Sequence, residues 1–496
     1  MCGLAGFINA RASAQEQRAW LAAMIARLHH RGPDEGGVWL EAPAALGHRR
    51  LSIIDLKTGR QPMLDQDGRA VIVLNGEIYN FAEIRGRLEA KGHRFRTRSD
   101  TEVLLAAYLD EGPACLDRLE GMFALAIWDR QKRLLFAARD RMGKKPFYYT
   151  LQDGLFAFAS ELTALSELPP LKLEVDRSAL ARYLAYEYVP TPGSIYRGVH
   201  KLRPGHYLTF QDGRLTTRPY WELPVPAERT ELTTAECAQK FLHLAGQAVK
   251  KRLVSDVPLG VFLSGGIDSS GVVALMAEQA AGPIKTFSIG FQEPSYDESA
   301  YARLVADRFG TDHHQEVLSA LDTASLLPQI VERFDEPISD PSIVPTYLLA
   351  QLTRQEVTVA LGGDGGDELF AGYEYYPAFQ AAGRYLRLPQ ALRAGLIEPL
   401  ARLAPASTGY VSPRHVVETF IQATRQPEWL RGQSMVGAMG PETQAQLWAE
   451  PDLEALAADN IYAETKSLWE SFPAGQPIDR LFYLFARQYL LAYILV

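Results

Sequence analysis

The sequence predicts two unlike domains in one chain. The first is an α+β domain of stacked antiparallel sheets with helices outside, and the second is an α/β domain with a doubly wound parallel sheet and a helical C-terminal part. Two observations lead to this prediction. Residues 1–165 hold short apolar runs joined by polar turns, whereas strands alternate with helical segments from about residue 234 onward. A chain of 496 residues is also too long for one hydrophobic core.

The first domain is expected to begin with a helix over Gln15–His29, because its apolar residues recur at helical spacing. These residues are Trp20, Leu21, Met24, Ile25 and Leu28. Strands are expected to follow at Ala45–Ile54 and Ala70–Leu74. The runs FALAIWD and RLLFAARD, joined by the polar turn Arg130–Lys132, predict two further strands.

A linker is expected where the composition changes. Residues 166–230 are rich in Pro and turn residues, and TTRPYWELPVPAERT ends this stretch. Beyond it come a helix through Lys250, a strand in PLGVFL, a helix in GVVALMAEQAA, a strand in IKTFSIGF, a helix near Ser299–Phe309 and a strand in EVTVALGG. Residues 375–496 read as helical throughout. We therefore place the domains at residues 2–215 and 234–496, with a linker at 216–233.

Composition excludes several classes of protein. The net charge of −8 argues against a nucleic-acid binder. The apolar runs are too short for a membrane span, and the N-terminus lacks a secretory signal. Three cysteines are too few for a disulfide framework, so we expect a reducing cytoplasm, with Cys115 and Cys237 as packing residues. The adjacent pairs His29–His30 and His313–His314 cannot each face one ligand, so they are expected to be hydrogen-bonded or solvated.

Cys2 follows Met1 directly. Removal of Met1 would leave one residue with both a thiol and a free α-amine, whose ordinary pKa values are about 8.5 and about 7.7–8. The amine can then act as the general base for its own nucleophile, so that no histidine is needed. A cysteine at position 2 carries little information alone, and the motifs that follow decide its meaning.

Four motifs follow Cys2 in order: HRGPDEGG, GHRRLSIIDL, VLNGEIYNF and TRSDTEVLL. With them, residues 2–165 closely resemble the class II glutamine amidotransferases, which use an N-terminal nucleophile. Taken singly, Arg50 and Asp100 suit surface charges, and Asn75–Gly76 suits a hairpin turn. Their ordered combination behind Cys2 favours a glutaminase.

The resemblance implies a role for each of these residues. Cys2 would attack the side-chain amide of glutamine. The Asn75 side chain and the Gly76 N–H would form the oxyanion hole, where loss of one donor typically costs about 10²–10³-fold in rate. The residues implied to contact glutamine are Arg50 at the α-carboxylate, Asp100 and Glu77 at the α-ammonium, and Ile54, Asn75 and Gly76.

The segment LSGGIDSS, Leu263–Ser270, lies between an apolar strand and a helix. Its glycines, hydroxyls and the following helix N-terminus would form an anion cradle of backbone N–H groups. It lacks the P-loop pattern G-x-x-x-x-G-K-[ST]. It resembles instead the SGGxDS pyrophosphate loop of enzymes that cleave ATP to AMP and pyrophosphate. ATP contacts are expected at Leu263, Ser264, Gly265, Gly266, Asp268, Ser269 and Ser270.

A second acidic-glycine segment, LGGDGGDELFAGY, covers Leu361–Tyr373 and follows the third predicted parallel strand. Loops at the C-terminal ends of adjacent strands face one crevice, so both segments can reach one nucleotide. Asp268 and Asp367 are the expected Mg²⁺ ligands, because carboxylates suit Mg²⁺ bound together with phosphates. The resemblance also implies nucleotide contacts at Ile289, Gly362 and Gly363, and a role in forming the acyl-adenylate for Asp364.

Together the two halves resemble asparagine synthetase from residue 2 to the end. The resemblance implies that ammonia from glutamine is transferred to a carboxylate activated by ATP as an acyl-AMP, with aspartate as the acceptor. Asparagine, AMP and pyrophosphate would be the products. The expected partners are glutamine, ATP, Mg²⁺ and the acceptor, with a homodimer implied and neither nucleic acid nor a membrane.

Three departures from the family keep other functions open. Asp364 stands where the family usually has Glu. The segment Phe334–Leu349, in the region that recognises aspartate, lacks the usual Thr and Arg pattern, so the acceptor could be a carboxylate on a sugar, a peptide or a surface-polymer precursor. QYLLAYILV ends before the family's Lys-Val-Asp-Arg segment, which predicts a truncated chain that is a glutaminase only or a degenerate protein. A sugar-phosphate aminotransferase is disfavoured by LSGGIDSS.

Overall fold

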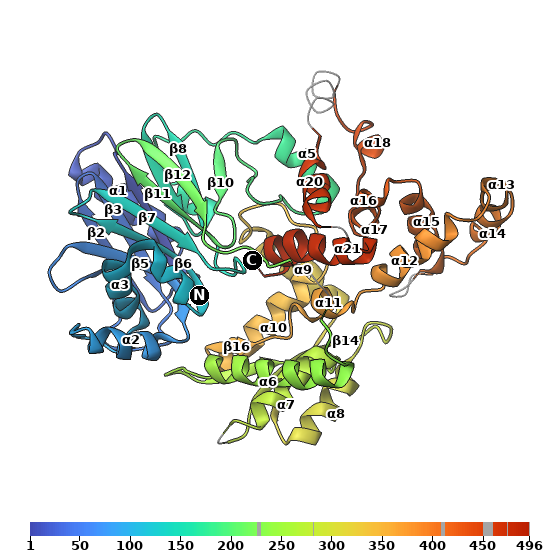
Figure 1. Cartoon of the computed structure of the whole chain (residues 1–496), viewed down its shortest axis with the longest axis horizontal. Coiled ribbons are helices and arrows are strands. Elements are labelled where there is room, and N and C mark those ends of the chain that lie inside the picture. The colour runs from blue at the N-terminus through green and yellow to red at the C-terminus, as the bar shows by residue number, and fades with distance from the viewer. Residues whose placement is uncertain (226–229, 281, 408–411, 450–459, 474, 496) are drawn as a thin grey trace.

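The computed structural model describes residues 1–225, 230–280, 282–407, 412–449, 460–473 and 475–495. Both predicted domains are present (Figure 1). The domain with two sheets takes up the blue-to-green part of the chain, the parallel sheet follows in colours from green through yellow to light orange, and the C-terminal helices are orange and red.

Two six-stranded antiparallel sheets form the first domain, as predicted. The first has the order β10-β8-β9-β1-β3-β2 and the second β12-β11-β7-β6-β5-β4. The strands of the first sheet are β1 (Gly3–Ile8), β2 (Glu35–Glu41), β3 (Ala44–Arg50), β8 (Tyr148–Gln152), β9 (Leu155–Ala159) and β10 (Val199–Lys201). Those of the second are β4 (Met63–Leu64), β5 (Ala70–Ile78), β6 (Gly121–Asp129), β7 (Leu134–Arg139), β11 (His206–Gln211) and β12 (Arg214–Pro219).

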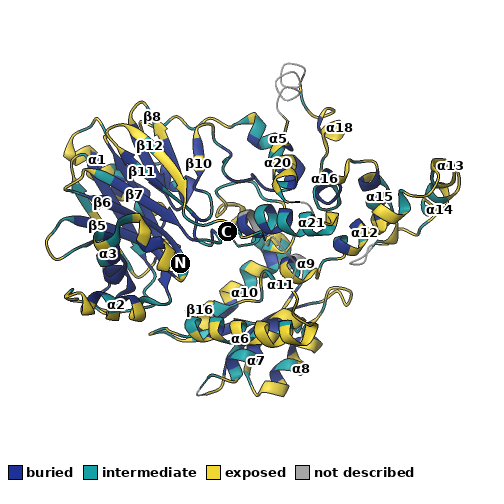
Figure 2. Cartoon of the chain, viewed as in Figure 1, coloured by how far each residue is buried: buried dark blue, intermediate teal, exposed yellow. Residues whose placement is uncertain are grey.

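Helices cover the outer faces of both sheets. The first sheet carries α1 (Ala14–Arg27), α4 (Leu162–Leu165) and α5 (Arg177–Tyr186), and the second carries α2 (Phe81–Ala90), α3 (Asp100–Glu111) and a 3₁₀ turn at Gly112–Arg118. Ser13 and Glu16 form a capping box that starts α1 at the predicted place. Between the sheets, Val71 and Val73 of β5 pack with Leu46 of β3, and Figure 2 shows both sheets as mostly buried.

Two boundaries in this domain differ from the prediction. β3 ends at Arg50 rather than Ile54, because the carbonyls of Ile54 and Asp55 bind the Arg50 side chain instead of a neighbouring strand. β12 pairs with β11, so residues 216–219, predicted as linker, form a strand of the second sheet. The polar alternation of RLTTRP hid this exposed edge strand. Residues 226–229 of the predicted linker lie outside the described residues.

The second domain holds a four-stranded parallel sheet with the order β15-β14-β13-β16. β13 (Leu259–Phe262), β14 (Lys285–Phe291) and β16 (Val359–Leu361) match the predicted strands, whereas β15 (Asp312–Leu318) was not predicted. The run DHHQEVL is polar because β15 is an edge strand with little burial. The helices around this sheet are α6 (Thr234–Arg252), α7 (Ile267–Ala277), α8 (Ser299–Phe309), α9 (Ala320–Val331), α10 (Ile343–Glu356) and α11 (Gly366–Phe370).

The described residues after 374 are helices and short connections, as predicted, although residues 408–411, 450–459, 474 and 496 lie outside the description. These helices are α12 (Tyr375–Tyr385), α13 (Gln390–Leu392), α14 (Glu398–Ala401), α15 (Pro413–Thr424), α16 (Glu428–Arg431), α17 (Gln433–Val436), α18 (Pro441–Gln444), α20 (Ala463–Ser471) and α21 (Pro477–Phe485), with π-helical stretches at Arg393–Ile397 and Ala486–Ile494. No described helix is both long and apolar enough to cross a membrane.

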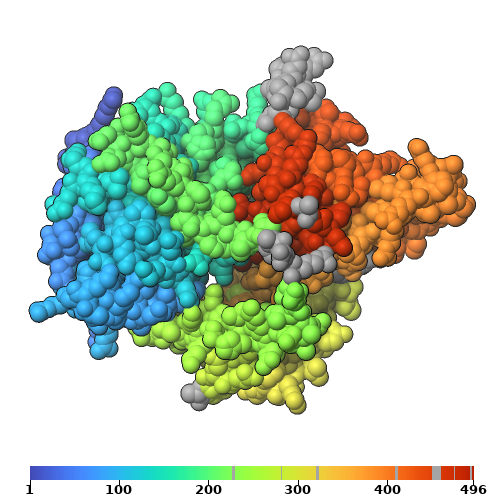
Figure 3. All heavy atoms as spheres, viewed as in Figure 1, coloured from blue at the N-terminus to red at the C-terminus, as the bar shows by residue number. Residues whose placement is uncertain are grey.

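The first domain packs against the C-terminal helices along a broad seam, where the green and red parts of the chain adjoin in Figure 3. The Tyr188 hydroxyl donates to the Gln488 carbonyl at 2.9 Å, and the hydroxyls of Tyr186 and Thr465 are 2.5 Å apart. These contacts are buried, so the two domains hold a defined relative position.

Candidate active site

The residues expected to bind glutamine come from separate elements and line one cavity of about 290 Å³. Cys2 precedes β1 and Arg50 ends β3, and the pairing of these strands sets Gly3 opposite Arg49. β5 supplies the next residues from the second sheet, and α3 begins at Asp100. The structure thus brings together Cys2, Arg50, Ile54, Asn75, Gly76, Glu77 and Asp100.

The Cys2 residue is held on two sides. Its thiol donates to the Leu51 carbonyl at 3.6 Å, and its own carbonyl accepts from Arg31 Nε at 2.9 Å. Arg31 is paired in turn with Glu161 at 2.8 Å. Burial raises the pKa of the Cys2 thiol, and the Met1 amine has the largest of the opposing effects. A thiol with a raised pKa needs a base beside it to become a nucleophile.

Arg50 is 5% exposed and fixed at the cavity wall. Its Nη1 pairs with Glu35 at 3.1 Å, and its Nη2 donates to the carbonyls of Ile54 and Asp55 at 3.0 and 2.8 Å. Ile54 therefore acts on the guanidinium through its carbonyl. A guanidinium held in this way keeps its geometry for a planar anion.

Asn75 and Gly76 lie within β5, paired with Ala124 and Phe123, and not in a hairpin turn. Asn75 is fully buried, yet neither polar atom of its amide has a hydrogen-bond partner among the described residues. Such an orphaned group typically costs about 1–3 kcal/mol, which a bound ligand would recover. Gly76 has φ +152°, and a Cβ there would lie 2.0 Å from the Met122 carbonyl oxygen, so only glycine fits.

Two buried carboxylates line the same cavity. Asp100 accepts the Ile78 N–H at 2.9 Å, and burial raises its pKa. Burial, and then the charge of Asp100, raise the pKa of Glu77 to about 7. Neighbouring carboxylates in a buried cavity favour a cationic partner such as an α-ammonium.

The second domain closes one side of this cavity, which the sequence did not indicate. Residues 358–360 line it, and they lead through β16 into the acidic-glycine segment. Nearby, the Asp256 N–H donates to the Ile53 carbonyl at 3.0 Å, and its carboxylate accepts the Asp55 N–H at 2.8 Å. This cavity and the second loop are therefore joined by one short strand.

The segment Leu263–Ser270 leads from β13 into α7 as a tight loop. Gly265 has φ +86°, and a Cβ there would lie 2.5 Å from the backbone of α8. The hydroxyls of Ser264 and Ser269 are 3.0 Å apart, and the Gly266 N–H donates to Ser264 Oγ at 3.2 Å. These bonds shape the loop around the N-terminus of α7, where an anion is stabilised.

The two glycine-rich loops meet between β13 and β16, where the strand order reverses. Doubly wound sheets bind their ligands at this switch point. A Cβ on Gly363 would lie 2.8 Å from the Ser269 nitrogen, so the loops are in contact. Ser270 Oγ is buried without a partner in the described part of the chain. The remaining predicted residues are Leu263, which is buried, Ile289, which is half-buried on β14, and Gly362 and Asp364, which are exposed in the second loop.

Asp268 and Asp367 face each other across these loops. A Cβ on Gly366 would lie 2.3 Å from the Asp268 carboxylate, so this side chain abuts the second loop. Burial, and then the charge of Asp268, raise the pKa of Asp367. Two repelling carboxylates beside an anion cradle fit Mg²⁺, which takes one or two carboxylates together with phosphate oxygens. The described residues contain no group of three or more metal-binding side chains.

The histidine pairs are hydrogen-bonded or ion-paired within the protein, as predicted. His30 pairs with Glu161 at 2.9 Å, His29 with Arg49, His313 with Thr286 at 2.9 Å and Ser288 at 3.2 Å, and His314 with Asp312 at 3.3 Å. Cys115 is buried in the first domain, also as predicted, and Cys237 is half-buried on α6.

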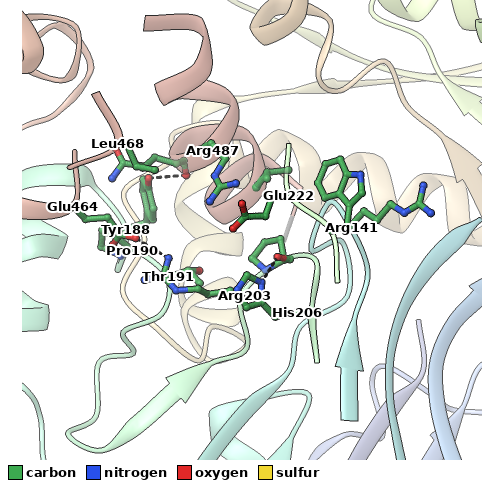
Figure 4. A pocket seen from close by; sticks show the side chains of 14 residues that line it. Arg141, Tyr188, Pro190, Thr191, Arg203, His206, Glu222, Glu464, Leu468 and Arg487 are labelled. Carbon is green, nitrogen blue, oxygen red and sulfur yellow. Dashed lines mark hydrogen bonds and ion pairs between the residues drawn. The ribbon is translucent and has the colours of Figure 1, made fainter. Parts of the chain in front are cut away.

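A second cavity lies on the seam between the domains (Figure 4). It measures about 40 Å³ and is lined by Arg203 of the first domain, Glu222 of the predicted linker and Arg487. Arg203 binds Glu464 across it at 2.9 Å. A space of this size holds one or two waters, so it is an interface void and not a substrate site.

Two protein-family models match this chain, one over each domain. The family model described as "Glutamine amidotransferase domain" matches residues 1–221. The one described as "Asparagine synthase" matches residues 240–496, about half of the chain. The chain belongs to the asparagine synthetase family.

Curated relatives of this asparagine synthetase family member are similar along most of its length. Asparagine synthetase [glutamine-hydrolyzing] 1 of Bacillus subtilis (strain 168) is 38% identical over 82% of this chain, which spans 65% of that protein. Putative asparagine synthetase 2 of Methanocaldococcus jannaschii is 38% identical, covering 75% of this chain and 76% of its own length. Amidase chyE of Penicillium rubens is 34% identical, covering 76% of this chain and 60% of its own length.

Proposed function

We propose that the chain is a glutamine-dependent amidotransferase that converts aspartate to asparagine with cleavage of ATP to AMP and pyrophosphate. The observation that carries the proposal is the glutamine cavity itself. Cys2, an anchored Arg50 and an orphaned Asn75 amide meet there beside β16, the strand that leads into the acidic-glycine loop. The names of the Bacillus subtilis and Methanocaldococcus jannaschii relatives support aspartate as the acceptor.

Glutamine would bind with its two charged ends apart. The Arg50 guanidinium takes the α-carboxylate, and Asp100 with Glu77 takes the α-ammonium. This places the side-chain amide at Cys2. As the sulfur attacks the amide carbon, the thiol proton passes to the α-amine exposed by removal of Met1.

The attack creates an oxyanion that needs donors placed in advance. The Asn75 amide and the Gly76 N–H supply them, and Asn75 can do so without breaking any bond of its own. The α-amine then returns its proton to the leaving nitrogen as the C–N bond breaks, which releases ammonia and leaves a thioester. Water hydrolyses the thioester to glutamate.

In the second domain, the loop Leu263–Ser270 would bind the pyrophosphate part of ATP through its N–H groups and the N-terminus of α7. Mg²⁺ held by Asp268 and Asp367 would neutralise phosphate charge there. The acceptor carboxylate attacks the α-phosphorus, pyrophosphate leaves, and Asp364 assists at the acyl-adenylate. Ammonia then displaces AMP to form the amide, with Leu263, Ile289, Gly362 and Gly363 at the nucleotide.

The proposal is tested by measuring glutamate, AMP and amide product from the full chain with glutamine, ATP, Mg²⁺ and aspartate. We expect all three products in equal amounts. Cys2→Ala should abolish glutamate release but leave AMP release with added ammonium salt. Asn75→Ala should lower glutamate release about 10²–10³-fold without lowering thermal stability, because its amide has no partner to lose.

A second candidate is an amidotransferase acting on a different carboxylate. It is favoured by the similarity to amidase chyE and by Asp335 and Glu336, which open the expected acceptor segment but bind the first domain. AMP release with sugar or peptide carboxylates, and none with aspartate, would establish this alternative. Glutamate release without AMP for any acceptor would reduce the function to a glutaminase.

A further inference from the structure

A lysine that none of the proposed steps uses lies in the glutamine cavity. Lys145 is 6% exposed and lines the cavity together with Met1, Cys2 and Glu77. Its ammonium makes no hydrogen bond or ion pair with the described residues. A buried ammonium without a partner is costly, so its retention calls for a role.

The loop that carries Lys145 is rigid. The Lys145 N–H donates to Asp140 Oδ2 at 3.1 Å, and its carbonyl accepts from Arg139 Nε at 2.9 Å. Asp140 also accepts the Phe123 N–H at 3.1 Å, on the strand opposite Gly76. The fully buried Arg139–Asp140 unit therefore fixes the lysine relative to the oxyanion hole.

We propose that Lys145 is a positioning residue of the glutaminase reaction: its ammonium lies in the cavity that holds Cys2 and keeps the α-amine of Cys2, freed by removal of Met1, unprotonated and ready to accept the Cys2 thiol proton. The inference rests on the proposed hydrolysis of glutamine at Cys2. A base near neutral pH is more effective than one that stays protonated, and a fixed positive charge beside an amine disfavours its charged form.

The charges around the amine support this reading. With Met1 in place, the terminal amine is that of Met1, one residue before Cys2. Burial lowers the pKa of this Met1 amine to about 5, and Arg31 and Lys145 lower it further against the opposing effects of Cys2 and Glu77. The charge of Lys145 also acts to lower the pKa of the Cys2 thiol, so it reaches the residue that carries the α-amine after removal of Met1. Arg50 and Asp100 also line the cavity.

Lys145 itself stays largely charged at neutral pH. Burial and then Arg31 lower its pKa to about 8, while Glu77, Asp140 and Cys2 act in the opposite direction. Arg31 is already paired with Glu161, so Lys145 is the cation whose field on the amine is not shared with an ion-pair partner.

The test compares kcat for glutamate release from about pH 5.5 to about pH 9.5 in Lys145→Gln, Lys145→Met and Lys145→Arg. Loss of the positive charge raises the pKa of the amine. The acid limb, which is the low-pH range over which kcat falls, should therefore move up by about one pH unit in Lys145→Gln and Lys145→Met. Lys145→Arg should keep the wild-type limb. The Met variant keeps the apolar stem and guards against a folding defect.

Lys144→Gln is the matched control. Lys144 is in the same loop, but the charges that act on it are Arg252, Asp140 and Asp364, and it is not among the charges that shift Cys2 or the terminal amine. Its acid limb should stay at the wild-type pH.

Two outcomes would overturn the inference. If KM rises in the two neutral variants while the acid limb of kcat stays at the wild-type pH, Lys145 is a ligand of the glutamine carboxylate. A uniform loss of kcat at every pH, shared by the Arg variant, would make it structural. The pH dependence of Cys2 alkylation by iodoacetamide, followed by peptide mass, measures thiolate formation without turnover; it should move to higher pH in Lys145→Gln and Lys145→Met, and an unmoved profile would show that the Lys145 charge does not act on Cys2. A wild type without glutaminase activity therefore refutes the proposed function while alkylation still tests Lys145.

Discussion

At the scale of single residues, the site is made by groups that the fold leaves unsatisfied or strained. Asn75 is buried without a hydrogen-bond partner in the described part of the chain, and Gly76 adopts a positive φ against the Met122 carbonyl. Neither feature contributes to the stability of the first domain. In the proposed reaction both would place donors where charge develops during amide hydrolysis, and functional sites commonly depart from optimal packing in this way.

Gly76→Ala should lose both stability and glutaminase activity. The added Cβ would meet the Met122 oxygen at 2.0 Å, so β5 must shift, at a cost of about 1–3 kcal/mol. Displacement of the Gly76 N–H should lower kcat about 10²–10³-fold. Urea unfolding and glutamate release measure the two effects. Gly86→Ala on α2, where a Cβ meets open space, should be neutral or slightly stabilising; an equal loss there would refute the steric explanation.

The KM for glutamine should rise as the pH falls below about 7. Burial and Asp100 raise the pKa of Glu77 to about 7, so this carboxylate is ionised above that pH and protonated below it. Only the ionised form attracts an α-ammonium, which predicts about a tenfold rise in KM per pH unit at most. In Glu77→Gln this pH dependence should disappear while KM stays high throughout. If the wild-type KM does not change with pH, Glu77 does not bind the α-ammonium of glutamine.

At the scale of elements, the second site depends on which strands are neighbours. β13 and β16 lie side by side although α7, β14, α8, β15, α9 and α10 separate them in the sequence. This adjacency brings the loop Leu263–Ser270 against Gly363 and sets Asp268 beside Asp367. The cost of placing two carboxylates together is relieved when a divalent cation binds.

Asp367→Asn should raise the thermal midpoint in the presence of a chelator and abolish stabilisation by Mg²⁺ with ATP. Removing one of two repelling charges should raise the midpoint by about 1–3 °C. The same substitution removes an oxygen ligand, so the midpoint should no longer respond to the cation. Thermal unfolding with and without Mg²⁺ measures both effects. Asp307→Asn, an exposed acid on α8, should change neither; a retained Mg²⁺ response in Asp367→Asn would exclude this carboxylate as a ligand.

At the scale of the whole molecule, the segment that opens with Asp335 and Glu336 joins the two domains. Asp335 accepts the N–H groups of Leu162 and Thr163 at 2.6 and 2.9 Å. Glu336 pairs with Lys201 at 2.5 Å and accepts the Ile195 N–H at 2.8 Å. The start of the expected acceptor segment is therefore a contact with the glutaminase domain.

Glu336→Gln should destabilise the protein by about 3–5 kcal/mol, because it leaves the buried Lys201 ammonium without its counter-charge. Adding Lys201→Met should recover most of this loss, since both charges are then absent. Chemical unfolding of Glu336→Gln, Lys201→Met and the double variant gives a double-mutant cycle, which measures the coupling energy between the two side chains. Lys285→Met, whose ion pair with Glu356 is exposed, should cost less than about 1 kcal/mol. A double variant as unstable as Glu336→Gln would refute a charge-based contact.

Most of the architecture could be predicted because its signals are local. Apolar residues at helical spacing mark α1, and apolar runs mark β5, β6, β7, β13 and β14. Several strands outside these runs were not predicted, including β1 and β9, which are buried and apolar but short, as well as β12 and β15. β15 and β12 are polar because they lie at sheet edges, and β3 ends early because Arg50 takes the carbonyls that follow it.

The sequence by itself indicated the chemistry proposed for both halves, because a cysteine at position 2, an arginine suited to a carboxylate and a glycine-rich loop suited to an anion can be recognised from residue types and their order. The tertiary structure alone decided that β16 borders the cavity that holds Cys2, that Lys145 lies in that cavity, and that the buried Asn75 amide has no hydrogen-bond partner among the described residues. The reason is physical. Burial and electrostatic coupling depend on groups that are distant along the chain, and only folding brings them within each other's field.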